Sequence, residues 1–330
     1  MFVAHRRPAF LLLLALLALV SAVAFPGEAR AQTCSATVTD VDFGSPNLLS
    51  GGYADALGTL TVTCTKIPIL TVVKICPSIG DGSGDSSGAA RLMRSSSGST
   101  LTYQLYQDSS RTLGWGATDE PQLGTVPAIT LGGGFSSGTA TTSVTIYGRL
   151  FGGQAGAPPG SYISIFEGSD VSFGYSSFFL GTNSSCTGFT GTSIIRPSFD
   201  VLAAPQAACT VATADLDFGT AGVLSTAINA QSTVRVTCTR DTTFNVTLDG
   251  GLANAAPTAR RMTSAAGDAI TYGLYRDTAR SAAWGNTVAN RVGGTGTGTE
   301  QVYPVFGQVP TQTTPRPGAY SDRVVVTVSY

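Results

Sequence analysis

The segment Arg323-Val-Val-Val-Thr-Val-Ser-Tyr330 decides the fold class, because its apolar side chains alternate with polar ones. One face carries Val324, Val326, Val328 and Tyr330. Thr327 and Ser329 fall on the other face. Alternation with period two is typical of a strand that buries one face in a core. We therefore expect an all-β domain in which this is the last strand, with an unpaired edge beside it.

Most of the chain is an internal repeat. The block Cys34-Ser-Ala-Thr-Val-Thr-Asp-Val-Asp-Phe-Gly44 returns as Cys209-Thr-Val-Ala-Thr-Ala-Asp-Leu-Asp-Phe-Gly219. The other matched blocks are Leu60-Thr-Val-Thr-Cys-Thr65 with Val234-Arg-Val-Thr-Cys-Thr239, Arg91-Leu-Met93 with Arg261 and Met262 after Arg260, Leu101–Asp108 with Ile270–Asp277, Arg111 and Trp115 with Arg280 and Trp284, Tyr147 with Tyr303, and Pro159–Tyr162 with Pro317–Tyr320. Collinear blocks of this kind predict two homologous domains. Their short alternating runs between Gly, Pro, Asn, Asp and Ser clusters indicate β-sandwiches.

The start of the chain predicts export. His5-Arg6-Arg7, an apolar run over 10–23 and Ala29-Arg-Ala31 are typical of a cleaved secretory signal, which we place at 1–31. An uncleaved anchor is the alternative, and the short apolar run disfavours it. We place the first domain at 32–203, a linker at 204–208 and the second domain at 209–330.

Composition excludes several function classes. The net charge of −1 lacks the basic footprint of a nucleic-acid-binding protein. The one histidine, His5, lies in the expected signal, so Ser-His-Asp and Cys-His catalysis and His-ligated zinc are excluded from the exported part. We expect no enzymatic activity and no cofactor.

Six cysteines in an exported chain indicate three disulfides. The repeat favours Cys34–Cys64 and Cys209–Cys238, because each joins the start of a domain to an early strand. Cys76 and Cys186 occur in the first domain alone and would pair with each other. Six cysteines allow 15 connectivities, so the others stay open.

The repeated blocks, Trp284-Gly and Arg316-Pro-Gly-Ala-Tyr before a Val-rich strand resemble the spore coat protein U domain. This domain is the pilin module of archaic chaperone–usher pili, and a two-domain member with a longer first domain resembles the tip adhesin of Csu-type pili. The resemblance implies tandem immunoglobulin-like sandwiches, the second of which lacks its final strand. It also implies that a periplasmic chaperone, and then the N-terminal donor strand of a neighbouring pilin, fills that position.

The residues support the same division. In the first domain, after a strand region over 162–175, the segment 194–203 places Ile195, Pro197, Phe199, Val201 and Ala203 on one face, so it can close the sandwich. In the second domain nothing follows the Val324–Tyr330 strand, which becomes the expected donor-strand acceptor edge. Only Gln32 and Thr33 separate the expected cleavage site from Cys34, so we expect no donor arm and a place at the end of a fibre.

The first domain has extra length in loops, with candidate segments at 66–84, 114–138 and 174–191. A fourth candidate, 149–159, has a counterpart of similar length in the second domain. Gly-rich loops with apolar side chains mark interaction surfaces, and the resemblance implies binding to apolar or abiotic surfaces. The expected surface-binding residues are Ile67, Ile69, Leu70, Val126, Ile129, Phe135, Phe178, Phe179, Leu180 and Phe189. Two alternatives stay open: 178–180 can be a buried strand, and the pattern of Ile129 and Leu131 favours a strand.

Other chemistry is weaker. Gly80–Gly88 resembles an acidic calcium loop but lacks spaced carboxylates, so a hairpin loop is favoured. Glu120, Glu167 and Asp170 are too sparse for a glycosidase pair. The recurrence of Tyr103, Tyr106 and Trp115 indicates shared core or strand packing, and Asp108 with Arg111 indicates a turn with a surface ion pair.

The sequence therefore predicts a pilus tip adhesin that promotes attachment and biofilm formation. Its expected partners are a periplasmic chaperone, an outer-membrane usher, the neighbouring pilin and an abiotic or host surface. Its expected location is the cell surface at the tip of a pilus. The alternative is a non-adhesive structural coat or shaft protein of the same family.

Overall fold

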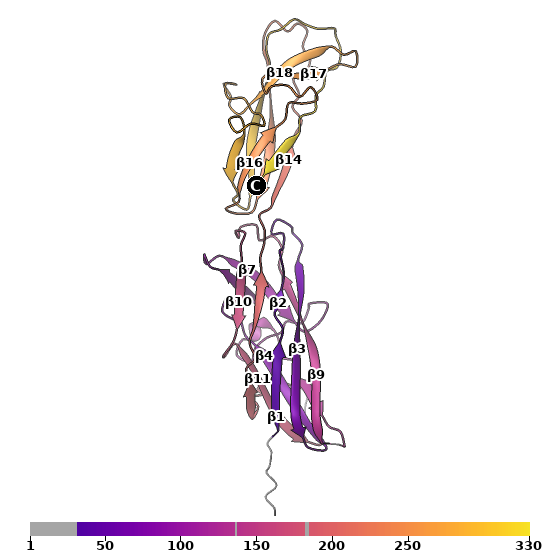
Figure 1. Cartoon of the computed structure of the whole chain (residues 1–330), viewed down its shortest axis with the longest axis vertical. Coiled ribbons are helices and arrows are strands. Elements are labelled where there is room, and N and C mark those ends of the chain that lie inside the picture. Colours follow the sequence, from indigo (N-terminus) through magenta and orange to yellow (C-terminus); the bar gives the residue numbers. More distant parts are fainter. Residues whose placement is uncertain (1–31, 136, 182–184) are drawn as a thin grey trace, which may run out of the picture.

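The computed structural model describes residues 32–135, 137–181 and 185–330. The expected signal segment and the question of a donor arm before Gln32 lie outside these residues. The described chain forms two β-sandwiches placed end to end along one long axis (Figure 1). None of the described residues forms a helix long and apolar enough to cross a membrane.

The first sandwich has one large sheet and one small sheet. The large sheet runs β1-β3-β9-β7-β6-β10-β13-β2, with β5 paired to β6, and the small sheet runs β12-β11-β4-β8. The elements are β1 (Thr33–Val38), β2 (Val41–Asp42), β3 (Ala54–Ile67), β4 (Thr71–Ile79), β5 (Ser86–Ser87), β6 (Ala90–Ser95), β7 (Thr100–Tyr106), η1 (Pro121–Leu123), β8 (Ile129–Gly132), β9 (Gly138–Leu150), β10 (Tyr162–Phe166), β11 (Val171–Phe179), β12 (Ser193–Ile195) and β13 (Phe199–Ala203).

The second sandwich repeats this plan with fewer strands. Its sheets run β14-β15-β20-β18-β17 and β19-β16-β21. The strands are β14 (Cys209–Thr213), β15 (Ile228–Cys238), β16 (Thr243–Leu248), β17 (Arg260–Thr263), β18 (Ala269–Tyr275), β19 (Val292–Thr295), β20 (Glu300–Val309) and β21 (Val326–Ser329). The all-β fold of two sandwiches expected from the sequence is confirmed.

The strand registers refine the repeat. Tyr106 pairs with Tyr147 on β9, whereas Tyr275 pairs with Phe306 on β20. The residue equivalent to Tyr147 is therefore Phe306, and the sequence match to Tyr303 was wrong. The sequence match aligned two tyrosines because they are identical. Backbone pairing, which fixes the strand register, shows that they occupy different positions.

A buried arginine also marks the repeat. Arg91 is fully buried and its guanidinium donates to the carbonyl oxygens of Gly80, Ile79 and Trp115. In the second sandwich Arg260, rather than Arg261, takes this place and donates to the carbonyl of Trp284. Buried cations of this kind persist because each guanidinium nitrogen donates to an acceptor.

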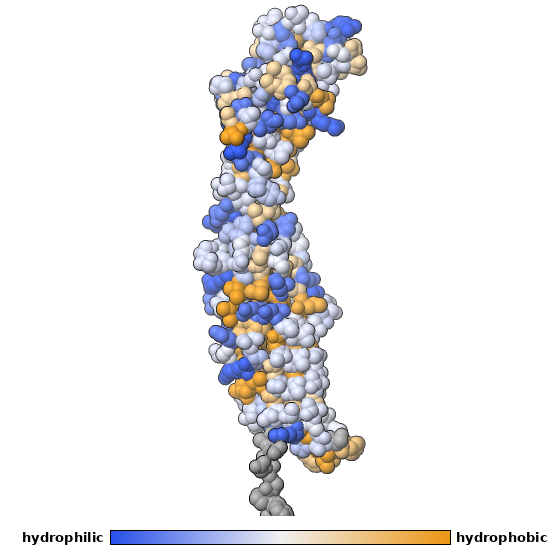
Figure 2. Space-filling model, in the orientation of Figure 1, coloured by the Kyte–Doolittle hydropathy of each residue, from blue (hydrophilic) through white to orange (hydrophobic). Residues whose placement is uncertain are grey.

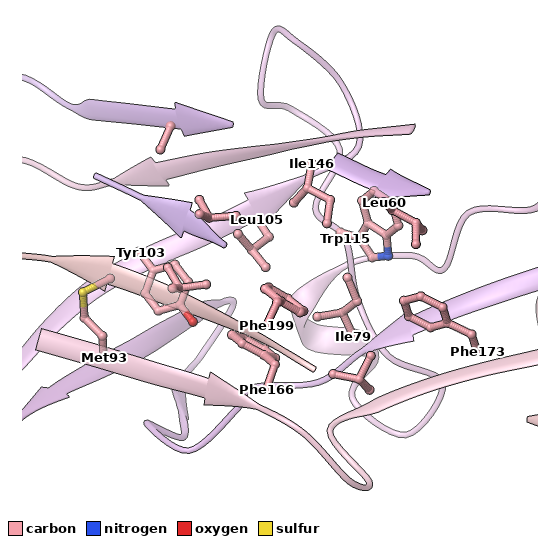
Figure 3. Close-up of a cluster of buried hydrophobic side chains, with 14 of the residues drawn as sticks. Leu60, Ile79, Met93, Tyr103, Leu105, Trp115, Ile146, Phe166, Phe173 and Phe199 are labelled. Carbon is pink, nitrogen blue, oxygen red and sulfur yellow. The ribbon is translucent and has the colours of Figure 1, made fainter. Parts of the chain in front are cut away.

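The core of the first sandwich lies between its sheets (Figure 3). Trp115 is fully buried and its indole N–H donates to Pro77 O at 2.8 Å. Trp284 repeats this contact to Val246 O at 3.1 Å in the second core. Tyr103 and Trp115 are therefore core residues, as expected, whereas Tyr106 is half-buried on β7.

The expected turn at Asp108 is present, but its ion pair is not the expected one. The Asp108 carboxylate accepts hydrogen bonds from the N–H groups of Thr112 and Leu113. Arg111 pairs instead with Asp55, at 3.3 Å. The side chain turns away from Asp108 because its Nε–H donates to Gly148 O on the neighbouring strand.

Three disulfides are present: Cys34–Cys64, Cys76–Cys186 and Cys209–Cys238. The pairing expected from the repeat is confirmed. Two of them tie the first strand of a sandwich to the next strand of its sheet, and the third ties β4 to the segment that follows β11. The join between sandwiches is short, and Arg240 N–H donates across it to Ala155 O at 3.0 Å.

Candidate functional site: an apolar pole and an open groove

Three connections meet at the end of the first sandwich that lies away from the second one (Figure 1). They are 68–70 between β3 and β4, the described residues 133–135 and 137 between β8 and β9, and residues 180–181 after β11. Leu70 N–H donates to Gly134 O, and Leu180 N–H donates to Leu70 O, each at 2.9 Å. Gly133 N–H donates to Thr71 O at 2.8 Å. The backbone therefore holds the three connections together as one surface, which we name the apolar pole.

Large apolar side chains on this surface face solvent. The exposed fractions are 53% for Ile69, 90% for Phe135, 68% for Phe179 and 70% for Leu180. Apolar residues gather at this lower end of the molecule in Figure 2. Single exposed apolar residues are ordinary, but a contiguous patch marks an interaction site.

The backbone at the apolar pole is strained. Leu70 and Leu180 have positive φ angles of 55° and 58°. The left-handed region costs a residue with a side chain about 1–2 kcal/mol. Such strain persists where the surroundings fix it, and it is concentrated at functional sites. Here the cross-loop hydrogen bonds fix it.

The other residues expected to bind a surface lie elsewhere. Ile67 and Ile129 are only 4% and 8% exposed, because they end β3 and begin β8 with their side chains in the core. Segments that looked like loops in the sequence are partly strands, and the strand alternative for Ile129 is confirmed. These two residues cannot contact a surface, so their assignment as surface-binding residues was wrong.

Four further candidates are half-buried: Leu70, Val126, Phe178 and Phe189. The rings of Phe178 and Phe189 lie 6.5 Å apart, and the Lys74 ammonium lies 4.2 Å from the centre of the Phe189 ring. These contacts pack the loop that Cys186 anchors against β4. Val126 follows Thr125, which pairs with Trp115, and is half-buried.

The second feature is a groove, which the first sandwich shows in its closed form. There β13 pairs antiparallel with β10 and parallel with β2. Phe199, Val201 and Ala203 are 4%, 0% and 3% exposed. Phe199 stacks on Phe166 with ring centres 4.6 Å apart, as Figure 3 shows. The expected closing strand of the first domain is thus present as β12 and β13.

In the second sandwich residues 320–324 take the place of β10. The Tyr320 hydroxyl donates to Arg316 O at 2.6 Å, as the Tyr162 hydroxyl donates to Pro158 O at 2.7 Å. Ser321 bridges to Thr263 as Ile163 bridges to Arg94. Within the described residues, however, no strand pairs with the other edge of 320–324, and β21 is an edge strand.

The position of the missing strand is hollow. Two adjoining cavities of approximately 680 and 420 Å³ occupy it, and Leu216, Phe218, Met262 and Tyr320 line both. We name this pair of cavities the open groove. Its floor was not predicted from the sequence, although the matched blocks around Leu216 and Phe218 held the signal.

Matched residues of the two sandwiches show how far the open groove exposes the core. Val41, Phe43 and Met93 are 0%, 8% and 0% exposed in the first sandwich. Their equivalents Leu216, Phe218 and Met262 are all half-buried. The rings of Phe43 and Tyr103 and those of Phe218 and Tyr272 make the same edge contact, at 6.2 and 5.9 Å, so the two cores are built alike. The difference in exposure therefore comes from the uncovered groove.

The expected buried face of the last strand is partly confirmed. Val324, Val326 and Val328 pack against the second core. Tyr330 is 61% exposed and lies beyond the end of β21, so its expected place on the buried face was wrong. Strand pairing stops at Ser329, and the alternation alone did not show this.

Four charged residues line the open groove: Asp215, Asp217, Arg316 and Asp322. The Asp322 carboxylate accepts from the Tyr272 hydroxyl at 2.6 Å and from Leu252 N–H at 2.9 Å. Burial, followed by the hydrogen bond to Asp322, raises the pKa of Tyr272, so the phenol stays protonated and donates.

The residues described hold no group of three or more His, Cys, Asp or Glu side chains arranged for a metal ion. In Gly80–Gly88 the carboxylates make local contacts: Asp81 accepts from the Ser86 hydroxyl at 3.1 Å, and Asp85 pairs with Arg94 at 2.6 Å.

The Spore Coat Protein U domain model matches residues 20–169 and 196–327, which together make up more than half of the chain. The chain belongs to this family. Two matches in tandem agree with the two sandwiches.

Protein U of Myxococcus xanthus is 38% identical over 101 residues, which are 29% of this chain and 56% of that protein. The chain thus spans about half the length of this curated relative.

Among solved structures, one chain of the CsuC–CsuE chaperone–tip adhesion subunit pre-assembly complex, from the archaic chaperone–usher Csu pili of Acinetobacter baumannii, matches with a TM-score of 0.51 and 17% identity. That match covers 90% of this chain and all of the other and shows a shared fold. The CupB6 tip adhesin of Pseudomonas aeruginosa aligns with a TM-score of 0.33 at 10% identity, over 91% of this chain and 94% of the other, which is too loose to support any conclusion.

Proposed function

We propose that this protein is an adhesive subunit at the tip of a chaperone–usher pilus. The observation that carries the proposal is the apolar pole, where Ile69, Phe135, Phe179 and Leu180 are exposed together on connections that hydrogen bonds hold at the far end of the molecule. An apolar surface brought against these side chains releases their hydration water, and this drives adhesion.

The open groove supplies the other half of the function. A sandwich with an uncovered apolar cleft beside an unpaired strand edge is an aggregation hazard unless another strand covers it. Strand addition satisfies the backbone of the edge and buries alternate side chains in the cleft. We propose that a periplasmic chaperone covers the groove first, and that a neighbouring pilin then replaces it at the outer-membrane usher. The shared fold with a chain of a chaperone–tip adhesion subunit complex supports this assignment.

The test compares two triple variants in the bacterium that makes the protein. One carries Phe135→Ser, Phe179→Ser and Leu180→Asn, since asparagine tolerates positive φ. The control carries Val223→Ser, Leu252→Ser and Val288→Ser, which alter equally exposed side chains of the second sandwich. Adhesion to polystyrene and biofilm mass are measured at equal surface display.

We expect the pole variant to lose adhesion at least tenfold and the control to keep it. Unchanged adhesion of the pole variant would instead favour a non-adhesive structural subunit of the coat or shaft. The groove is tested separately by attaching residues 193–205 after Tyr330 through a Gly/Ser linker of about 12 residues, which can span the distance as a flexible coil. We expect this extended chain to be stable without chaperone and to be excluded from fibres. An extended chain that still co-purifies with chaperone would contradict strand acceptance.

A further inference from the structure

The open groove also indicates the chemistry of the strand that it accepts. This inference rests on the proposed function, because it concerns the partner of that groove. In the first sandwich, β13 shows which side chain a bound strand places at each position of the groove. Along β13, Phe199 faces Phe166, Val201 faces Ser164 and Ala203 faces Tyr162. All six side chains are almost fully buried.

The same positions in the second sandwich are Val324, Asp322 and Tyr320. Two observations fix this register: the matching tyrosine hydroxyl bonds and the matching bridge at Ser321. A strand that binds the groove in the way that β13 binds the first sandwich therefore places one side chain directly against Asp322. The first sandwich has a neutral serine at that position. The change from Ser164 to Asp322 brings a carboxylate to a position that the seated strand buries.

Asp322 is only partly satisfied before the strand arrives. Its Oδ2 accepts from the Tyr272 hydroxyl, and its Oδ1 accepts from the N–H groups of Leu252 and Arg323 at 2.9 and 2.8 Å. A carboxylate offers about four acceptor positions. Asp322 is half-buried and lines the smaller cavity, where water reaches it. An apolar side chain placed there would remove that water and return no hydrogen bond, which is unfavourable for an ionised group.

We propose that the strand accepted by the groove comes from another subunit and carries a hydrogen-bond-donating side chain, of the threonine, asparagine or lysine type, against Asp322. A large apolar residue stands two positions before it and a small residue two positions after it. The large residue fits because Val324 is smaller than Phe166 and leaves the space that the phenyl ring fills in the first sandwich. The small residue fits because Tyr320 occupies its position as Tyr162 occupies the place opposite Ala203.

The test uses the full chain extended after Tyr330 by the linker and residues 193–205, with the residue at the copy of Val201 varied. Valine, threonine and aspartate are compared, because threonine has the shape of valine and adds one hydroxyl. Hydrogen exchange is measured at the backbone amides of 216–219 and 320–326, which the seated strand covers. Each form is also made with Asp322→Ser, which restores the chemistry of the first sandwich, and with Asp322→Asn.

We expect threonine to raise protection of these amides at least tenfold over valine, and aspartate to lower it. With Asp322→Ser the advantage of threonine over valine should disappear, because valine then faces serine as it does in β13. With Asp322→Asn the penalty for aspartate should fall. Equal protection by valine and threonine in the unsubstituted chain overturns the inference and leaves strand acceptance intact. If no form protects the amides, strand acceptance itself fails, and the inference fails with it.

Discussion

Replacing Leu180 with glycine tests the apolar pole, because this substitution should weaken adhesion while leaving the fold at least as stable. Leu180 is 70% exposed and has a φ of 58°. Most substitutions that abolish a function also weaken a fold, which makes the loss hard to interpret. At Leu180 the loss of adhesion can be separated from a loss of stability, because glycine relieves backbone strain while it removes an exposed apolar side chain.

The magnitudes follow from the structure. Glycine removes a left-handed penalty of about 1–2 kcal/mol and adds flexibility to the unfolded chain worth about 0.5–1 kcal/mol. The free energy of unfolding should therefore stay level or rise by up to about 1.5 kcal/mol. Full burial of a leucine is worth about 1.5–3 kcal/mol. Because 70% of Leu180 is available, its loss should cost each contact about 1–2 kcal/mol, or about 5–30-fold in affinity.

The matched control is Leu252→Gly in the second sandwich. Leu252 is 72% exposed but does not have a positive φ. This variant should lose up to about 1 kcal/mol of stability and should adsorb like the unsubstituted chain. Adsorption of the purified full chain to polystyrene is followed on a quartz crystal microbalance, and stability is followed by urea unfolding of the same samples. A destabilised Leu180→Gly variant would refute the assignment of strain, and unchanged adsorption would refute the role of the apolar pole.

Three other predictions concern the first sandwich. Phe199→Ala should lower its free energy of unfolding by about 3–5 kcal/mol in urea, because Phe199 is 4% exposed in the closing strand. Replacing Cys76 and Cys186 together by serine should cost about 4–5 kcal/mol in the chain-entropy model, because the bridge spans 110 residues, and the transition of the second sandwich should not move. Burial, and then the charge of Asp81, raises the pKa of Glu120. The folded state thus binds this proton more tightly, and stability falls as pH rises through the window between the ordinary and the raised pKa. Glu120→Gln should therefore be more stable than the unsubstituted chain at neutral pH and equal to it below the ordinary glutamate pKa, as measured by urea midpoints at both.

The repeat and the alternation of side chains are local properties of the chain, and they gave a correct account of the architecture. Val324, Val326 and Val328 alternate because one face of a strand is buried, and the five-residue face from Ile195 to Ala203 closes the first sandwich for the same reason. The duplication also predicted Cys34–Cys64 and Cys209–Cys238, because a bridge that ties neighbouring strands recurs with the strands themselves. It left Cys76 and Cys186 to pair with each other, as they do.

Tertiary structure decided which apolar residues are available for binding. Ile67 and Ile69 are two residues apart, yet one is 4% and the other 53% exposed, because β3 ends between them. Phe135 and Leu180 are far apart in sequence and share the apolar pole because their strands end at the same edge of the sandwich. The sequence did not reveal the Asp322 carboxylate in the open groove, for the same reason. Asp322 looks like an ordinary surface acid in the sequence, and only the register against β10 shows that a neighbouring strand would bury it. Side-chain alternation is set by the geometry of one strand, whereas the meeting of distant segments depends on how all the strands are connected and paired.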